Sequence, residues 1–156
     1  MLVQYALEGR VARLTLDSPH NHNALSTALV EQLHRGFDDA VAAGARVVVL
    51  GHTGRTFCAG ADLSEAAGRD PGDIAVDRAQ EMTRLLRAIL AAPVPVIAAV
   101  DGHVRAGGMG LVGACDIAVA GPQSTFALTE ARIAPVSREM ILNFVAQTSL
   151  GLPRSY

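Results

Sequence analysis

Four glycines fall within seven residues of this sequence, at Gly107, Gly108, Gly110 and Gly113, shortly after an apolar run. No acidic or basic side chain stands among them. Glycine lets a ligand approach the backbone closely, and the N–H groups at the start of a helix attract an oxygen that carries negative charge. The stretch therefore indicates chemistry done by main-chain amides, provided that a second donor loop exists.

A second loop of small residues is present at TFCAGADL, residues 56–63. It follows the strand predicted at 47–51, as the glycine cluster follows the strand predicted at 95–100. Two such loops on neighbouring strands could aim two N–H groups at one point, with Gly107 supplying one of them. That arrangement is an oxyanion hole, which needs no side-chain chemistry.

The glycine cluster has two other interpretations. Gly108, Gly110 and Gly113 match the dinucleotide fingerprint G-x-G-x-x-G, with Glu130 downstream. That motif needs a helix long enough to cross over to the next parallel strand, which takes about a dozen residues. The next predicted strand begins at about Asp116, so this interpretation fails on geometry. The simpler alternative is that the glycines only let a short helix pack tightly on a sheet.

The elements that must position these loops alternate between strand and helix, which predicts an α/β fold. Ser26 is a suitable N-cap for a first helix that ends at Gly44, and Asp73 is the expected cap of a second helix. The other elements are strands, predicted at 3–7 and 11–16 (a hairpin), 47–51, 95–100 and 116–120.

Length and charge exclude several classes of protein. The chain has 156 residues, half of them hydrophobic, which fits one domain with a substantial core. A net charge of −2 without a basic stripe argues against a nucleic-acid partner. Glu8 and Arg10 interrupt any signal peptide, and no run of about 18 apolar residues predicts a membrane span. We therefore expect a cytoplasmic protein without a membrane partner.

The cysteine and histidine patterns give no sign of a metal. Cys58 and Cys115 are far apart in the sequence and are expected to be buried thiols in a reducing compartment. His20 and His22 do not have the spacing of a metal-ligand motif. No metal is therefore predicted.

Four segments in order resemble the crotonase superfamily, the enoyl-CoA hydratases and isomerases. They are NHNALS (21–26), TFCAGADL (56–63), PVIAAVDGHVRAGGMGLVGACDIAVA (95–120) and STFALTEARI (124–133). The resemblance covers roughly residues 1–134. It implies a crotonase-like spiral of ββα units that binds an acyl-CoA thioester. It also implies a homo-oligomer built from trimers, and no cofactor other than the coenzyme A of the substrate.

The resemblance assigns roles to particular residues. The N–H groups of Ala61 and Gly107 would hold the thioester oxygen as it becomes an enolate. The segment Ala61, Asp62, Leu63 and Ser64 would contact the adenine end of coenzyme A. His20 and His22 would lie near the other side of the nucleotide, although a solvated loop pair is an equally good interpretation of these two histidines.

Family hydratases usually employ two glutamates, of which this chain has one. The first would fall at Gly110, and the second falls at Glu130. A carboxyl group with apolar neighbours can have its pKa raised towards neutrality, which suits proton transfer at carbon; the alternative is a surface glutamate that opens a helix. The resemblance favours hydration of a 2-enoyl-CoA, whereas a single carboxylate is sufficient for isomerisation.

After Ile133 the sequence departs from the family motifs. Residues 135–156 are interpreted as a divergent tail, and the helical region that covers the acyl pocket in the family is not recognisable. The sequence thus predicts a C-terminally truncated member. Because a site left open to water is weakened, a third alternative is a non-catalytic acyl-CoA-binding or assembly protein.

Overall fold

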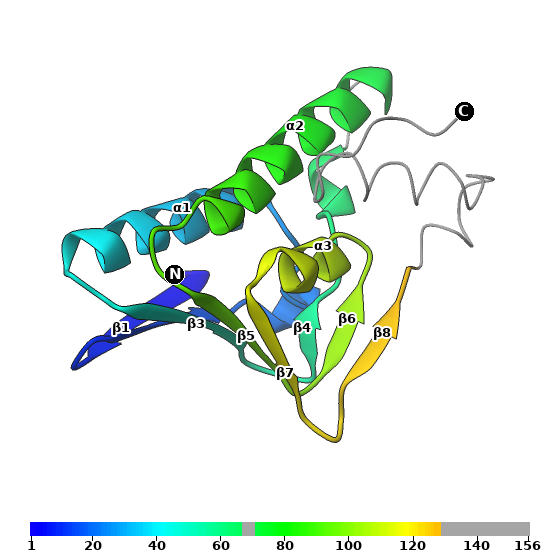
Figure 1. Cartoon of the computed structure of the whole chain (residues 1–156). Coiled ribbons are helices and arrows are strands. Elements are labelled where there is room, and N and C mark those ends of the chain that lie inside the picture. The colour runs from blue at the N-terminus through cyan, green and yellow to red at the C-terminus, as the bar shows by residue number, and fades with distance from the viewer. Residues whose placement is uncertain (67–70, 129–156) are drawn as a thin grey trace, which may run out of the picture.

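The structure is a computed structural model that describes residues 1–66 and 71–128. Within these residues the chain forms a five-stranded sheet, a three-stranded sheet and three α-helices. Figure 1 shows the helices α1 (Thr27–Ala42) and α2 (Pro71–Leu90) lying side by side over one face of the larger sheet. The predicted α/β class is confirmed.

The larger sheet has the strand order β1-β2-β3-β5-β7. Its strands β1 (Val3–Glu8) and β2 (Val11–Leu16) form the expected antiparallel hairpin, and every later pairing is parallel. The remaining strands are β3 (Val47–His52), β5 (Val96–Val100) and β7 (Ile117–Ala120). Parallel strands need a crossover, which α1 supplies between β2 and β3 and α2 supplies before β5.

The hydrophobic core lies between the larger sheet and its helices. Alternate residues of β2, Ala12, Leu14 and Leu16, are fully buried, as expected for one face of a strand. Apolar residues at helical spacing on α1 and α2 cover them: Leu29, Val30, Leu33, Phe37, Leu85, Leu86 and Ile89. Burial of these side chains fixes the register of the sheet, because a slip of one residue would expose them.

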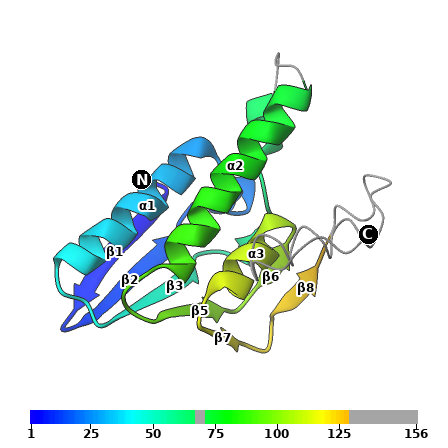
Figure 2. The same ribbon diagram turned by 45° about the horizontal axis from the view of Figure 1, so that its top comes forward.

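A second sheet carries the segments of interest, and the sequence did not predict it. Its strands are β4 (Thr56–Cys58), β6 (His103–Arg105) and β8 (Thr125–Ala127), all parallel. Figure 2 shows the short helix α3 (Gly107–Ala114) close to β6, and α3 packs against α2, β4 and β6. The donor loops were expected directly after β3 and β5, but each follows a further strand, β4 or β6.

The helix boundaries agree with the sequence except at one end. Ser26 caps α1, and its Oγ accepts the N–H of Leu29 at 3.3 Å, as predicted. The second helix begins at Pro71 and not after Asp73. Proline suits the first helical position because its missing N–H would have had no intrahelical partner there. The predicted Asp73 cap is therefore wrong.

Candidate functional site

The two predicted donor loops leave neighbouring parallel strands. Cys58, the last residue of β4, is paired with Val104 in the middle of β6. Both strands therefore deliver the chain to the same edge of the smaller sheet, where the 59–62 loop and the Ala106–Gly107 turn begin. A Cβ added to Gly60 would lie 3.2 Å from the amide nitrogen of Gly107. The structure thus brings the two loops into direct contact.

Hydrogen bonds account for all but one of the N–H groups in the 59–62 loop. Three of them donate to the chain: residue 59 to the carbonyl of His22 (3.1 Å), Gly60 to Sγ of Cys58 (3.4 Å) and Asp62 to the carbonyl of Leu25 (3.2 Å). For the N–H of Ala61, residues 1–66 and 71–128 provide no acceptor. One amide of this loop is therefore available to a ligand.

The direction of the Ala61 amide follows from its own peptide unit. The carbonyl of Gly60 accepts the N–H of Leu25 at 2.7 Å, and the described chain has no cis peptide bond. In a trans peptide the C=O and the following N–H point in opposite directions. The N–H of Ala61 is thus aimed away from the Leu25 amide that holds its peptide unit.

The second loop presents an amide at the start of a helix. Gly107 is the first residue of α3, so its N–H has no intrahelical acceptor, and no other acceptor for it occurs among the described residues. Ala106 before it has φ 51° and ψ −126°, a conformation that alanine adopts rarely. Such strain costs about 1–3 kcal/mol and persists where the surrounding structure imposes it. The backbone here is held in a particular orientation.

The glycines of the cluster serve different purposes. A Cβ on Gly107 would clash with the terminal methyl of Met82 at 2.5 Å and make ordinary contacts with Leu25 and Gly60, whereas a Cβ on Gly108 would lie 2.8 Å from both Cβ and the carbonyl oxygen of Cys58. Around Gly113 there is no atom within 4 Å of the added carbon. Tight packing against backbone therefore explains Gly108, whereas a side chain at Gly107 would displace mainly the flexible end of Met82.

The segment predicted to meet coenzyme A begins with an ordered carboxylate. Oδ1 of Asp62 accepts the hydroxyl (2.7 Å) and the N–H (3.0 Å) of Ser64, and Oδ2 accepts the side-chain amide of Asn21 (3.0 Å). The Ser64 hydroxyl, followed by these other donors, lowers the pKa of Asp62. Leu63 is 78% exposed, which is unusual for a large apolar side chain. This segment can offer polar and apolar contacts at the surface.

Of the two predicted histidines, the structure links one to the first loop. His22 is linked to it directly, because its carbonyl accepts the N–H of residue 59, and its backbone is left-handed with φ 59°. His20 is exposed in the short 3-10 helix η1 (Pro19–Asn21), with its Nδ1 3.5 Å from Oγ of Ser18. Glu130, the predicted catalytic carboxylate, lies outside the described residues.

Asn23 is a supporting residue that the sequence analysis missed. It is fully buried and has a left-handed backbone with φ 54°. Its side chain accepts the N–H of Ser18 at 2.7 Å and donates to the carbonyls of Thr53 (3.0 Å) and Thr56 (2.7 Å). The tolerance of asparagine for left-handed backbone was the available signal.

A charged cluster holds the far end of the first loop. Glu65, in the 3-10 helix η2 (Leu63–Ala66), accepts the N–H and the hydroxyl of Thr27 at 3.2 Å, which places a negative charge at the start of α1. Arg78 of α2 pairs with both Glu65 and Glu81. The cluster ties η2 to both long helices.

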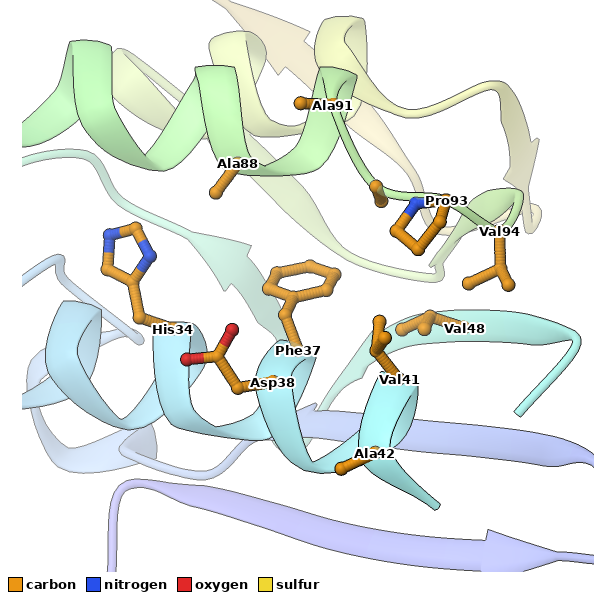
Figure 3. A pocket seen from close by; sticks show the side chains of 11 residues that line it. His34, Phe37, Asp38, Val41, Ala42, Val48, Ala88, Ala91, Pro93 and Val94 are labelled. Atoms are coloured by element: carbon orange, nitrogen blue, oxygen red, sulfur yellow. The ribbon is translucent and has the colours of Figure 1, made fainter. Parts of the chain in front are cut away.

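One hollow of the described residues lies away from these loops. It has a volume of about 410 Å³ and lies between the C-terminal halves of α1 and α2. Figure 3 shows Phe37 and Val41 facing Ala88 and Pro93 across it. None of the predicted site residues lines it. The described residues also contain no group of three side chains placed to hold a metal ion, and no helix among them is long and apolar enough to cross a membrane.

Comparison with known proteins supports the relationship that the motifs suggest. The family model for "Enoyl-CoA hydratase/isomerase" matches residues 7–151, beyond the limit of 134 drawn from the motifs. Among curated relatives, the mitochondrial enoyl-CoA hydratase domain-containing protein 3 of Danio rerio is 36% identical over 121 residues, which are 77% of this chain and 42% of the relative. The chain spans about half the length of the curated relatives it matches.

Solved structures agree in fold. An enoyl-CoA hydratase from Mycobacterium avium is 60% identical, with a TM-score of 0.79 over 96% of this chain and 57% of that one. The enoyl-CoA hydratase of Mycobacterium smegmatis is 34% identical, with a TM-score of 0.81 over 86% of this chain and 53% of that one. The fold is crotonase-like, and the chain belongs to the enoyl-CoA hydratase/isomerase family.

Proposed function

We propose that this chain is part of an enoyl-CoA hydratase-like enzyme that adds water across the double bond of a 2-enoyl-CoA. The N–H groups of Ala61 and Gly107 would hold the thioester oxygen. The hydroxyl of water would bond to the β carbon and a proton to the α carbon, with negative charge on that oxygen in between. Glu130 would move the proton.

The observation that carries the proposal is the pair of unused amides on touching loops. The N–H of Ala61 is the one donor of its loop without an acceptor in the described chain, and that of Gly107 is at the start of a helix. Such donors stabilise an oxygen that gains charge during the reaction, and removing one typically costs about 2.7–4 kcal/mol of transition-state stabilisation.

The resemblance further supports a surface for coenzyme A along Asp62, Leu63 and Ser64, with His20 and His22 near the nucleotide. An acyl-CoA thioester is the proposed partner, and a cytoplasmic homo-oligomer is the proposed state. The buried hydrogen bonds that fix the 59–62 loop would hold the donors in place before the substrate binds, which avoids reorganisation during the reaction.

Isomerisation of an enoyl-CoA is the second candidate. Gly110, where a family hydratase would carry its first glutamate, has no side chain to orient water. A Cβ there would lie 3.4 Å from Cδ1 of Leu86, so apolar surface replaces a carboxylate at this point. One carboxylate at Glu130 would be sufficient to shuttle a proton between two carbons.

The two candidates differ in the thioester that reacts. Purified chain would be mixed with crotonyl-CoA, whose conjugated absorbance falls on hydration, and separately with a β,γ-enoyl-CoA, whose absorbance rises on isomerisation. The Glu130→Gln variant should abolish either change. If neither thioester reacts while coenzyme A still raises the melting temperature, the chain is a binding protein and the catalytic proposal is wrong.

A matched pair of variants tests the donor at Gly107. Gly107→Pro removes the N–H but suits the first position of a helix, whereas Gly107→Ala keeps the N–H. Both place a Cβ against the same Met82 methyl. We expect kcat/KM of the proline variant to fall about 100- to 1000-fold below that of the alanine variant. Equal values in two folded variants would contradict the role of this amide.

A further inference from the structure

We propose that Cys58 is a positioning residue for the oxyanion hole, whose buried thiol fixes the orientation of the first donor loop against the second. The inference rests on the proposed function. It assigns no chemistry to the sulfur, because Cys58 is fully buried and cannot meet a substrate.

The thiol holds the loop that carries Ala61. Sγ of Cys58 accepts the N–H of Gly60 at 3.4 Å. On the other side of the same residue, the carbonyl of Gly60 is held by the N–H of Leu25. Both peptide units that flank Gly60 are therefore fixed, and the second of them contains the N–H of Ala61. Loss of the sulfur would free the first peptide unit to rotate.

The same side chain touches the loop that carries Gly107. A Cβ built on Gly108 would lie 2.8 Å from Cβ of Cys58 and 3.3 Å from its Sγ. The start of α3 therefore rests on this side chain. Cys58 lies between the two loops, so its size sets how closely they approach, and its sulfur sets the orientation of one of them.

The chemical state of the thiol suits this role. Burial raises the pKa of Cys58 to about 12, so the group is a neutral thiol near neutral pH. It forms no disulfide. A neutral sulfur is a weak acceptor, which is enough to orient an N–H that has no water to compete for it. It also places no negative charge beside an oxygen that becomes an anion.

Three substitutions at Cys58 separate the effect of its hydrogen-bond acceptor from the effect of its side-chain volume. Cys58→Ser keeps a small acceptor, Cys58→Val fills the space without an acceptor, and Cys58→Ala removes both. Cys115→Val is the matched control: the thiol of Cys115 donates to the carbonyl of Leu111 in α3, away from the donor loops.

The readout is the polarisation of a bound thioester. A conjugated dienoyl-CoA bound in an oxyanion hole has its absorption band shifted to longer wavelength, because the two N–H groups withdraw electrons through the carbonyl. We expect the valine and alanine variants to lose most of this shift while binding coenzyme A about as tightly as wild type. Their kcat should fall about 10- to 100-fold with little change in KM, since a small misplacement of donors costs that much.

Serine should restore most of the shift, and the Cys115→Val control should retain all of it. If the valine variant does not fold, the alanine and serine variants decide the comparison. A full shift in every folded Cys58 variant would overturn the positioning role. Binding of the dienoyl-CoA to wild type without any shift would instead overturn the proposed oxyanion hole, and this inference with it.

Discussion

The two loops that carry the proposed donors are held by different means. The 59–62 loop is bound to residues 22 and 25 by main-chain hydrogen bonds, and the buried side chain of Asn23 anchors the strand before it. The Ala106–Gly107 turn has few such bonds and instead rests on packing against Cys58 and Met82, with a strained alanine. One donor is fixed by a network and the other by shape, so substitutions should affect them differently.

Replacing Gly60 by alanine should have the largest effect, because this glycine is where the two loops touch. Its φ is +97°, and an added Cβ would lie 2.5 Å from Cβ of Ala106. We expect the free energy of unfolding to fall by about 2–5 kcal/mol, from left-handed strain and overpacking together. Urea unfolding would measure the loss.

Gly9→Ala is the control for strain alone, since φ of Gly9 is +62° and no atom lies within 4 Å of an added Cβ. It should cost only about 1–2 kcal/mol. Ala106→Gly should relieve left-handed strain in wild type and in Gly60→Ala alike, and the removed contact should make its effect about 1–2 kcal/mol larger in the Gly60→Ala background. Equal losses for Gly9→Ala and Gly60→Ala would show that the loops do not touch as described.

Replacing Asn23 by alanine tests the network that supports the first loop. The change leaves the N–H of Ser18 and the carbonyls of Thr53 and Thr56 without their partner in a buried setting. We expect a loss of about 2–4 kcal/mol in the free energy of unfolding. Amide exchange of residue 59 should accelerate as well, measured by NMR.

Asn21→Ala is the comparison for that prediction. Asn21 is only partly buried, and its side chain contacts Ser18 and Asp62 near the surface. Its loss should cost less than about 1.5 kcal/mol. The support role of Asn23 would be contradicted if the two alanine variants were equally stable.

Alanine substitutions at two glycines of α3 should change the free energy of unfolding in opposite directions, because only the first turn of this helix is packed against the other loop. Gly113→Ala should raise the free energy of unfolding by about 0.5–1 kcal/mol, since alanine favours helix and the site is open. Gly108→Ala should lower it, because the added carbon meets the backbone of Cys58. Thermal unfolding of both variants measures the contrast, and a stabilised Gly108→Ala would refute the packing.

The smallest effect concerns acid stability at the surface end of the first loop. The pKa of Asp62 is lowered in the folded state, chiefly by the Ser64 hydroxyl. Its contribution to stability is therefore present above the ordinary aspartate pKa of about 3.9 and is lost as pH falls through the lower folded value. Between pH 5 and pH 2, the free energy of unfolding should fall less in Ser64→Ala than in wild type. An unchanged pH profile would show that Ser64 does not bias this carboxyl group.

Much of the fold follows from local patterns. The hairpin, the Ser26 cap, the buried strands and the glycine-rich loops were each predicted from spacing and residue type, and the structure confirms them. The strands β4, β6 and β8 were missed because three residues are too few to show an alternating pattern. The start of α2 was misplaced because the cap preference of Asp73 was favoured over the first-turn preference of Pro71.

The candidate site was predicted only in outline. Ala61 and Gly107 were assigned by resemblance, and their roles, with that of Glu130, remain predictions. The supports at Asn23, Cys58 and Arg78 were not foreseen. An asparagine in a polar loop gives little sign that it is buried, and a cysteine in a small-residue motif gives no sign of which N–H its sulfur will accept.

By itself, the sequence determined the family, the alternation of strands and helices, and the two small-residue loops, because periodicity, caps and glycine act over a few neighbouring residues. Only the tertiary structure decided that Gly60 contacts the turn before α3 and that the amide of Ala61 has no acceptor among the described residues. Both depend on the parallel pairing of β4 with β6 and on bonds to residues 22 and 25. Such contacts join segments far apart in the chain, so no local pattern can specify them.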